Sequence, residues 1–351
     1  MALDDRKKQV LKAIVDDYVS TYEPVGSKSL IEKHNFTVSS ATLRNEMAEL
    51  EKMGLLEKPH TSAGRIPSDK GYREYVDSLI SVDNLTESEK EEISARIDGS
   101  VDDVESVLKS ATSALSETTG FVSLAMSPRL QGSYLSQLKM LMIEPGKVLV
   151  VVVLSAGVVK DKVVRIPNFL TGEQINRISN AVEKTLSGKP LDEITFVTLA
   201  TSAKDADIPD SFLNQVLYET YVTIKQADKL DVYLEGEHRM LSLPDFSELG
   251  RARDLLGTLS HDGMVAGYVN EIEALGREEG KSDSYMIRIG QEIALEGLED
   301  CSFITTTYKL GDTLSGNIGI IGPKRMDYSK VISQINFVRK KLNDEIKRLS
   351  E

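Results

Sequence analysis

The sequence predicts an α+β protein of several domains that begins with a small helical domain. A chain of 351 residues can form two or three domains that each bury their own core. The first 77 residues carry apolar side chains at helical spacing, followed by two short extended segments around a polar loop. Later in the chain, strand patterns stand on both sides of a helical block. This order predicts one sheet domain with a second domain inserted into it.

Apolar residues at intervals of three and four predict the helices of the first domain. A helix over residues 6–20 would bury one face, formed by Val10, Leu11, Ile14, Val15 and Tyr18. Residues 21–26 end this helix, and Ser27 is expected to cap a short second helix over 27–34. After a turn, Ser39 begins a third helix, whose buried stripe is Leu43, Met47 and Leu50.

A hairpin and a fourth helix follow. Residues 55–58 and 65–67 are extended segments on either side of a polar loop, which predicts two paired strands. Ser68 is then expected to cap a helix that carries Tyr72, Tyr75, Val76 and Leu79. Three helices followed by a hairpin form a winged helix, in which the second and third helices make a helix-turn-helix.

The rest of the chain alternates between strand and helix patterns. An acidic, serine-rich linker over residues 83–110 leads into a helix, and β-rich sequence begins at Gly120. Strands are predicted at 137–144, 147–155, 158–166, 194–199, 231–235, 285–290, 302–309 and 316–322. Helices are predicted at 172–187, 210–227 and about 246–275, and a long last helix starts at Tyr328 with a cap at residues 327–329.

The last helix leaves two interpretations open. Its apolar residues recur at spacings of three and four, and they are Val331, Ile335, Val338, Leu342, Ile346 and Leu349. This spacing suits a coiled-coil seam, but the short repeat favours a helix packed on its own sheet. Just before it, Lys324 and Arg325 are expected to be solvated. Glycines at 316, 319 and 322 indicate close packing within a strand rather than a phosphate-binding loop.

The charge of the chain is unevenly distributed. The net charge is −13, yet residues 1–77 hold 12 Lys and Arg against 13 Asp and Glu, a net −1. Between residues 58 and 73 a basic strip consists of Lys58, Arg65, Lys70 and Arg73, with Asp69 as the one acidic residue. This strip can approach DNA phosphates, whereas the acidic remainder would discourage non-specific binding to the polyanion.

The third helix has the side chains that a helix needs to read the major groove of DNA. Burial of its apolar stripe turns Ser40, Thr42 and Arg44 outward beside the capping Ser39. Small hydroxyl side chains allow close approach, and Arg44 can hold guanine O6 and N7 as a bidentate pair. Asn45 can pair with adenine or hold a phosphate. On the hairpin, the residues expected to touch the backbone or the minor groove are Lys58, His60, Thr61 and Arg65.

Other classes of site are not indicated. Four scattered histidines and the single Cys301 show no metal-ligand spacing, and no nucleophile–base pair, phosphate loop or cofactor motif is evident. The sequence therefore predicts no catalytic, metal or cofactor site, which disfavours an enzyme. The hydroxyl-rich helix start suits duplex DNA better than the aromatic platforms that bind single-stranded RNA. One cysteine suits a reducing cytoplasm, no signal peptide is recognised, and the apolar run 148–159 is too short to span a bilayer.

Five segments carry longer motifs. Three lie near the N-terminus: Glu23–Ser27 (EPVGS), Ala41–Met47 (ATLRNEM) and Gly54–Ser68 (GLLEKPHTSAGRIPS). Two lie late in the chain: Ile289–Glu292 (IGQE) and Gly319–Tyr328 (GIIGPKRMDY). These motifs resemble the HrcA family of heat-inducible transcription repressors. Matches towards both ends indicate that the resemblance covers the whole chain, although residues 168–280 match only in pattern.

The resemblance implies a winged helix-turn-helix, a GAF-like α/β domain and an α/β dimerisation domain inserted into it. Taken with the sequence patterns, these would cover residues 1–77, 111–167 with 281–351, and 168–280, with a linker and helix at 78–110. The resemblance also implies a homodimer on a double-stranded inverted-repeat operator of the CIRCE type, ahead of the chaperone operons of the DnaK and GroEL systems. The GroEL–GroES chaperonin would keep the repressor folded, and heat would divert the chaperonin and relieve repression.

One alternative stays open. GAF-type folds often hold small ligands, so the repressor could instead respond to a small molecule bound in its GAF-like domain. No set of residues in the sequence marks such a pocket.

Overall fold

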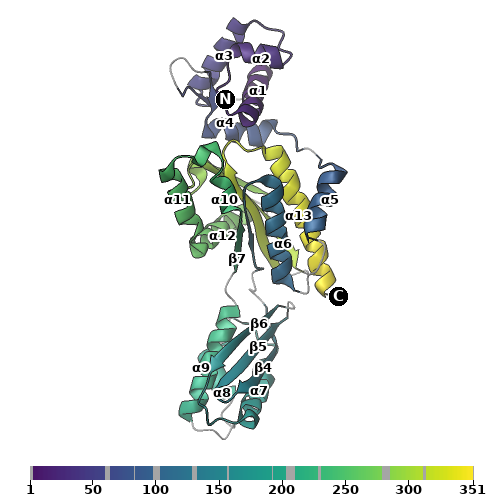
Figure 1. Ribbon diagram of the computed structural model, residues 1–351, viewed down its shortest axis with the longest axis vertical. Helices are drawn as coiled ribbons and strands as arrows, with labels where there is room; N and C mark the ends of the chain where they lie inside the picture. The colour runs from purple at the N-terminus through teal and green to yellow at the C-terminus, as the bar shows by residue number, and fades with distance from the viewer. Residues whose placement is uncertain are drawn as a thin grey trace.

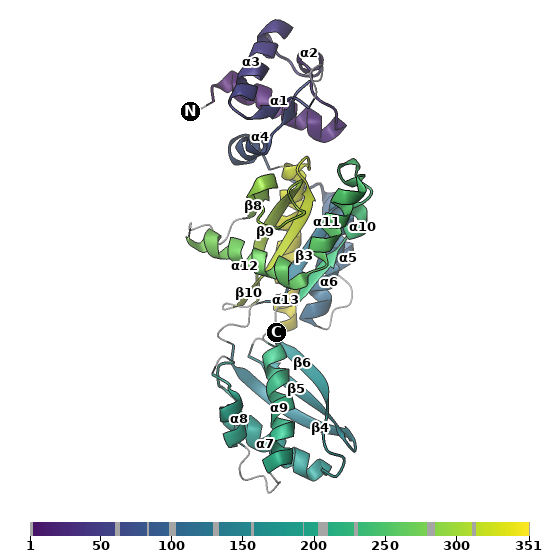
Figure 2. The same cartoon turned by 90° about the vertical axis from the view of Figure 1, so that its left-hand side faces the viewer.

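The computed structural model describes residues 3–59, 64–82, 84–97, 103–128, 133–155, 158–191, 193–202, 210–227, 231–278, 285–310 and 314–350. The chain forms three units that follow one another along the long axis of the molecule (Figure 1), and Figure 2 shows the same order from the side. We call them the head, up to residue 82, the central unit, 84–128 with 231–350, and the distal unit, 133–227.

The head contains the predicted helices and hairpin. Its elements are α1 (Asp5–Thr21), α2 (Ser27–Lys33), α3 (Ser40–Lys52), β1 (Leu56–Glu57), β2 (Ile66–Pro67) and α4 (Asp69–Glu74), which continues as a π-helical turn over Tyr75–Leu79. Its core is the set of stripes expected from the sequence, including Val10, Leu11, Ile14, Val15, Leu43, Met47 and Leu50. The caps predicted at Ser39 and Ser68 are confirmed.

The cap predicted at Ser27 is wrong. Gly26 is the N-cap residue of α2, and no side chain caps its first turn. The Ser27 hydroxyl lies 2.9 Å from the Ser40 hydroxyl instead. A serine at a helix start suits a cap, but a partner in the next helix along the chain competes for its single hydroxyl.

The central unit is a five-stranded antiparallel sheet between two layers of helices. Its strands are β3 (Val122–Met126), β7 (Val232–Glu235), β8 (Met286–Ile289), β9 (Cys301–Leu310) and β10 (Leu314–Pro323), in the order β7-β3-β10-β9-β8. One layer holds α5 (Glu87–Ile97), α6 (Val104–Thr119) and α13 (Tyr328–Ser350), and the other holds α10 (Glu237–Met240), α11 (Leu249–Leu259) and α12 (Asp262–Glu278). A 3-10 turn, Gly290–Glu292, follows β8.

Two sequence interpretations are confirmed in this unit. The apolar residues of α13 from Val331 to Ile346 are buried, and the helix packs on α6 and β9 rather than presenting a free seam. At Gly316 of β10, a Cβ would lie 2.3 Å from the Tyr308 hydroxyl, so only glycine fits this closely packed strand.

The distal unit is a three-stranded antiparallel sheet covered on one face. Its strands are β4 (Leu135–Glu144), β5 (Lys147–Leu154) and β6 (Val159–Arg165), in that order, and its helices are α7 (Gly172–Leu186), α8 (Phe196–Ser202) and α9 (Asp210–Ala227). Helices α7 and α9 pack on the sheet. The two chain segments that lead to this unit run side by side, because Met126 pairs with Val232 and Ser127 N donates to Asp231 O at 2.9 Å.

The strands are divided between the sheets differently from the prediction. The strands near 137–166 were expected in the same domain as those at 285–322, but β4, β5 and β6 form a sheet of their own. Strand β7, expected in the inserted block, pairs with β3 in the central sheet. The interruption of the central unit therefore spans about 128–231 rather than 168–280. Alternating hydrophobicity shows that a strand exists but not which sheet it joins.

The strand predicted at 194–199 is also wrong, because residues Phe196–Ser202 form α8. β-branched and aromatic residues favoured a strand there. The Thr195 hydroxyl accepts the Thr198 backbone N–H at 3.2 Å and so caps a helix.

Candidate nucleic-acid interface

Helix α3 buries one face in the head and leaves the other in solvent. Leu43, Met47 and Leu50 pack in the core of the head, and Glu46 packs against α1, so the outward face of α3 begins with Arg44 and Asn45. Arg44 and Asn45 are both exposed, and neither has a hydrogen-bond or ion-pair partner among residues 3–59 and 64–82. This leaves a cationic fork and an amide free at the outward start of the helix.

The hydroxyls at the start of α3 are already in use. Ser39 Oγ accepts the Thr42 backbone N–H at 3.1 Å and lies 3.0 Å from Thr42 Oγ1. Ser40 is half-buried and contacts Ser27 of α2. Ser39 and Thr42 therefore fix the helix start, while Ser40 fixes its position against α2.

The hairpin stands next to α3. Leu56 pairs with Pro67 and Glu57 with Ile66, and a further bridge joins Arg65 to Val25 before α2. Lys58 is exposed just beyond β1. His60 and Thr61 lie outside the described residues.

Arg65 differs from the other predicted contacts. Its Nε donates to Glu51 Oε2 at 2.8 Å, its Nη2 lies 2.6 Å from the same oxygen, and the side chain is only 16% exposed. Glu51 is in the last turns of α3, so this ion pair ties the hairpin to the helix. Its partner and its burial make Arg65 a less accessible cation than Arg44 or Lys58.

The basic strip predicted between residues 58 and 73 is not one surface. Lys58 and Lys70 are both exposed, but Lys70 donates to the Met53 carbonyl at 3.0 Å and Arg73 pairs with the central unit. A cation that the sequence reasoning missed is Lys28, which is exposed in the first turn of α2 beside the Ser27–Ser40 contact. The sequence could have indicated this residue, because Lys28 directly follows Ser27 at the predicted start of the second helix.

Three acidic side chains of the head surround Lys7 of α1. Lys7 of α1 donates to Asp4 and lies within 3.1 Å of Glu46 and 3.0 Å of Glu49, both on α3. The hydrogen bonds to Asp4, then Glu49 and Glu46, raise the pKa of Lys7, which stays charged. Lys7 therefore offsets part of the negative charge of α3, and Arg44 has no ion-pair partner among the described residues of the head.

This arrangement can bind a polyanion through a short helix. Arg44 offers a two-pronged donor and Asn45 a donor and an acceptor near the start of α3. Lys58 and Lys28 offer single charges beside it, and the Arg65–Glu51 ion pair joins the hairpin to α3. Donors of this kind recognise base edges and phosphates.

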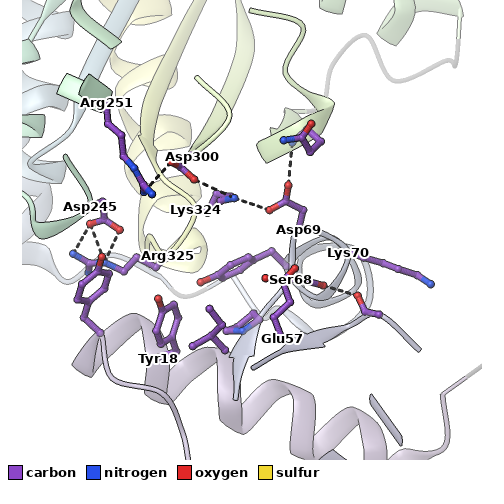
Figure 3. Close-up of a pocket in the computed structure, with 16 residues that line it drawn as sticks. Tyr18, Glu57, Ser68, Asp69, Lys70, Asp245, Arg251, Asp300, Lys324 and Arg325 are labelled. Carbon is purple, nitrogen blue, oxygen red and sulfur yellow. Dashed lines mark hydrogen bonds and ion pairs between the residues drawn. The ribbon is translucent and has the colours of Figure 1, made fainter. Parts of the chain in front are cut away.

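A separate cavity of about 630 Å³ lies where the head meets the central unit (Figure 3). Its head side includes Tyr18, Tyr22 and Tyr72, and its central side includes Asp245, Arg251, Asp300, Lys324 and Arg325. Lys324 and Arg325 were expected to be solvated, which is wrong: Lys324 lies 2.8 Å from Asp69 Oδ1 and Arg325 2.8 Å from Asp245 Oδ2. None of the described residues predicted to touch DNA lines this cavity.

Other functional groups do not gather into sites in the described parts of the chain. No three His, Cys, Asp or Glu side chains there could share a metal ion, and no described helix is long and apolar enough to cross a membrane. Cys301 is buried in the central sheet, and burial raises the pKa of its thiol.

Comparisons with known proteins agree over almost the whole length. A family model described as the HrcA protein C-terminal domain matches residues 105–332. Heat-inducible transcription repressors HrcA from Ruminiclostridium cellulolyticum and Acetivibrio thermocellus are each 40% identical to this chain, covering 99% of it and 99% and 98% of their own lengths. The HrcA of Moorella thermoacetica is 38% identical over 99% of both chains.

One solved structure shares the fold. It is a crystal structure described as that of a hypothetical protein at 2.2 Å resolution, with a TM-score of 0.65 and 23% sequence identity over 99% of this chain and all of that one. The expectation that this chain is no enzyme agrees with the family, whose members are transcription repressors. The matches over the full length show that the chain belongs to the HrcA family of heat-inducible transcription repressors.

Proposed function

We propose that this chain represses transcription by placing a winged helix-turn-helix, the head, on duplex DNA. The observation that carries the proposal is the outward start of α3, beside a hairpin that presents Lys58. There Arg44 and Asn45 are exposed and have no partner within the described part of the head. In this mode α3 enters the major groove and the hairpin contacts the backbone. Ser39, Ser40 and Thr42 shape the helix start, and His60 and Thr61 at the hairpin tip would add contacts. The target is an inverted repeat of the CIRCE type ahead of chaperone operons.

An inverted repeat requires a two-fold symmetric protein, so we propose a homodimer. The distal unit supports this, because its described helices cover one face of the sheet and leave the other open. The other face carries apolar side chains that are exposed or half-buried, namely Leu141, Leu149, Val151, Val153, Val159 and Val163. A second copy of the same sheet would bury this face by packing against it. The distal unit would then be the dimerisation domain, and the central unit the GAF-like domain.

The proposed relief of repression by heat involves the GroEL–GroES chaperonin. Within β5, Val150 and Val152 are buried, and Val151 and Val153 lie on the open face. A strand of this composition is prone to aggregation when partly unfolded copies expose it, and such copies are chaperonin substrates. Loss of chaperonin capacity at high temperature would lower the amount of active dimer.

The test of the DNA proposal is a salt titration with the full-length protein. Affinity for a duplex that carries the inverted repeat should fall steeply as salt rises, because each neutralised phosphate releases counterions. A duplex of the same length with scrambled half-sites is the control, and its binding should be weaker at every salt concentration. An affinity that does not change with salt, or equal affinity for both duplexes, would contradict the proposal.

A second candidate function is a repressor that responds to a small molecule. The cavity at the junction of head and central unit favours it, because a ligand held there would contact both units. A metabolite extract, with chaperonin omitted, should then restore operator binding to an aged preparation. Restoration by chaperonin and nucleotide but not by the extract would leave the first candidate alone.

A further inference from the structure

The late motifs at residues 289–292 and 319–328 converge on helix α4 of the head. Arg73 Nε donates to Glu292 Oε1 at 2.9 Å, another nitrogen of the guanidinium bonds to Glu292 Oε2, and Arg73 also donates to the Ile287 carbonyl at 2.7 Å. Three acceptors of the central unit thus hold one guanidinium of the head. These segments lie more than 200 residues apart in the chain.

Asp69, at the start of α4, is held on both carboxylate oxygens. The Gln291 backbone N–H donates to Oδ2 at 3.0 Å, and Lys324 lies 2.8 Å from Oδ1 and 3.5 Å from Asp300. Gly290 allows this approach, because a Cβ there would lie 2.0 Å from Asp69 Oδ2 and its φ is +55°. Desolvation lowers the pKa of Lys324, but the hydrogen bond to Asp69 and the charge of Asp300 outweigh it, so the pKa is raised and the ion pair persists at neutral pH.

A second set of contacts holds the end of α1. Arg325 makes two hydrogen bonds of 3.0 Å to the Asp245 carboxylate (Figure 3). Its guanidinium also lies 4.2 Å from the centre of the Tyr22 ring. Tyr22 ends α1 in the left-handed region, with φ of 59°. Beneath these polar groups, the buried rings of Tyr72 and Tyr328 lie 6.1 Å apart. The head is therefore docked on the central unit at α1 and α4.

Helix α4 is in turn fixed to the DNA-facing part of the head. Ser68 Oγ donates to the Gly54 carbonyl at 2.6 Å, and Ser68 N donates to the Leu55 carbonyl at 3.2 Å. At Gly71, a Cβ would lie 2.0 Å from the Leu55 carbonyl oxygen, so α4 packs directly on the backbone that connects α3 to the hairpin. A rotation of α4 would therefore turn α3 with it.

We propose that Asp69, Arg73, Lys324 and Arg325 are positioning residues that set the angle of each head on its central unit, and so select the spacing between the two half-sites that the repressor accepts. The proposal rests on the proposed dimer and inverted repeat. Two rigidly held recognition helices fit one half-site separation, whereas two loosely tethered heads tolerate several. The motifs at residues 289–292 and 319–328 would then affect DNA recognition indirectly, because they fix the position of the head and do not contact DNA.

The test compares the unaltered chain with Arg73→Gln, Lys324→Gln and the double variant. The control is Arg253→Gln, since Arg253 is 83% exposed and, among the described residues, pairs with the adjacent Asp254 alone. The probes are inverted-repeat duplexes built from half-sites that the unaltered protein selects from a random pool, with spacers varied one base pair at a time over one helical turn, and a duplex with a single half-site. The unaltered chain and Arg253→Gln should prefer one spacing by at least about tenfold.

In the double variant this preference should shrink by about tenfold, while affinity for the single half-site changes less than about twofold. Lys324→Arg, which keeps the charge, should retain most of the preference. An unchanged preference in the double variant would overturn the proposal. Equal losses on all duplexes would also overturn it, because they would indicate damage to the head rather than loss of its position.

A readout without DNA separates this proposal from the function on which it rests. Spin labels at Lys52→Cys in the head and Ser260→Cys in the central unit report their separation, and the buried Cys301 should not be labelled. The distance distribution should be narrow in the otherwise unaltered chain and clearly broader in the double variant. A narrow distribution with no preference for inverted repeats would contradict the proposed function alone, whereas equal widths in both proteins would contradict the positioning role.

Discussion

The hydroxyl oxygens of Ser27 and Ser40 lie 2.9 Å apart and join the first turn of α2 to the first turn of α3. Ser27 is buried and Ser40 is half-buried, so solvent can replace this contact only in part. Helices α2 and α3 are therefore held together at the end that would face DNA in the proposed function.

Ser27→Ala should loosen the start of α3. Removal of the hydroxyl leaves Ser40 without its partner, at a cost of about 1 kcal/mol, which corresponds to roughly fivefold faster hydrogen exchange of the α3 amides. Ser40→Ala should have the same effect, and the double variant should add little to either. Ser29→Ala, in the same helix, is the control. Additive losses in the double variant would show that the two hydroxyls do not act as a pair.

Arg44→Ala should reduce specific binding far more than non-specific binding. Loss of a bidentate contact to a base costs about 1–3 kcal/mol of discrimination. Lys58→Ala should weaken binding to operator and scrambled duplexes alike and lower the salt slope by about one. Lys52→Ala, at the other end of α3, should change neither. Equal losses on both duplexes for Arg44→Ala would show that Arg44 contacts only the backbone.

Arg65 was predicted from the sequence to touch DNA, and its ion pair with Glu51 offers a way to test this. If Arg65 mainly holds the hairpin, as its partner and burial lead us to expect, Glu51→Ala and Arg65→Ala should weaken operator binding by similar factors. If Arg65 contacts DNA directly, Glu51→Ala should free the guanidinium and preserve or raise the affinity. Fluorescence anisotropy with the operator duplex distinguishes the two results.

Leu149→Asp should separate the proposed dimer. Leu149 lies on the open face of the distal sheet between Leu141 and Val163, and a carboxylate there cannot be buried against a second copy without a large cost. Sedimentation should show monomers, and affinity for the inverted repeat should fall while that for a single half-site is retained. Leu249→Asp, on α11, is the matched control because Leu249 is 84% exposed. Monomers from both variants, or from neither, would exclude this sheet face as the interface.

Acid should weaken the contact between α5 and α13 through Glu89. The Thr86 backbone N–H donates to this carboxylate and Lys330 lies 2.9 Å from it, and these two groups, in that order, lower its pKa to about 2. Because the folded-state pKa lies below the ordinary value of 4.5, the stabilisation is present above pH 4.5 and is lost as the pH falls towards 2.

The unfolding temperature of the unaltered chain should therefore fall more steeply between pH 4.5 and 2 than that of Glu89→Gln. Glu91→Gln, an exposed neighbour on α5, should follow the unaltered chain. Parallel curves for the unaltered chain and Glu89→Gln would show that this carboxylate contributes no acid dependence.

Local features of the fold could be predicted from the sequence because they depend on neighbours in the chain. The caps at Ser39, Ser68 and Asp327, and the buried stripe of α3, follow from residues within one or two turns. Features that depend on distant partners could not be predicted in this way. The sequence around Lys324 does not show that this lysine will form an ion pair with Asp69. The sequence of β4 does not show which sheet the strand joins.

The same limit applies to the candidate site. The exposure of Arg44 and Asn45 follows from the helical period, because the buried positions of α3 determine the free ones. The ion pair between Arg65 and Glu51 does not follow from the helical period. Glu51 lies 14 residues earlier in the chain, and the hairpin brings the two side chains together. The DNA contacts of His60 and Thr61 stay predictions, as both residues lie outside the described part of the chain.

The pairing of Met126 with Val232 has a consequence for how this architecture can be altered. Strands β3 and β7 are antiparallel neighbours, so the polypeptide leaves and re-enters the central sheet at one point. The distal unit is thus equivalent to an enlarged turn within a single β-hairpin. Excision of residues 129–230 and closure with a connector of about two to five residues would restore an ordinary hairpin. Such a shortened protein would keep the head and the central unit in their order along the chain, and a domain that assembles differently could be inserted in place of the distal unit.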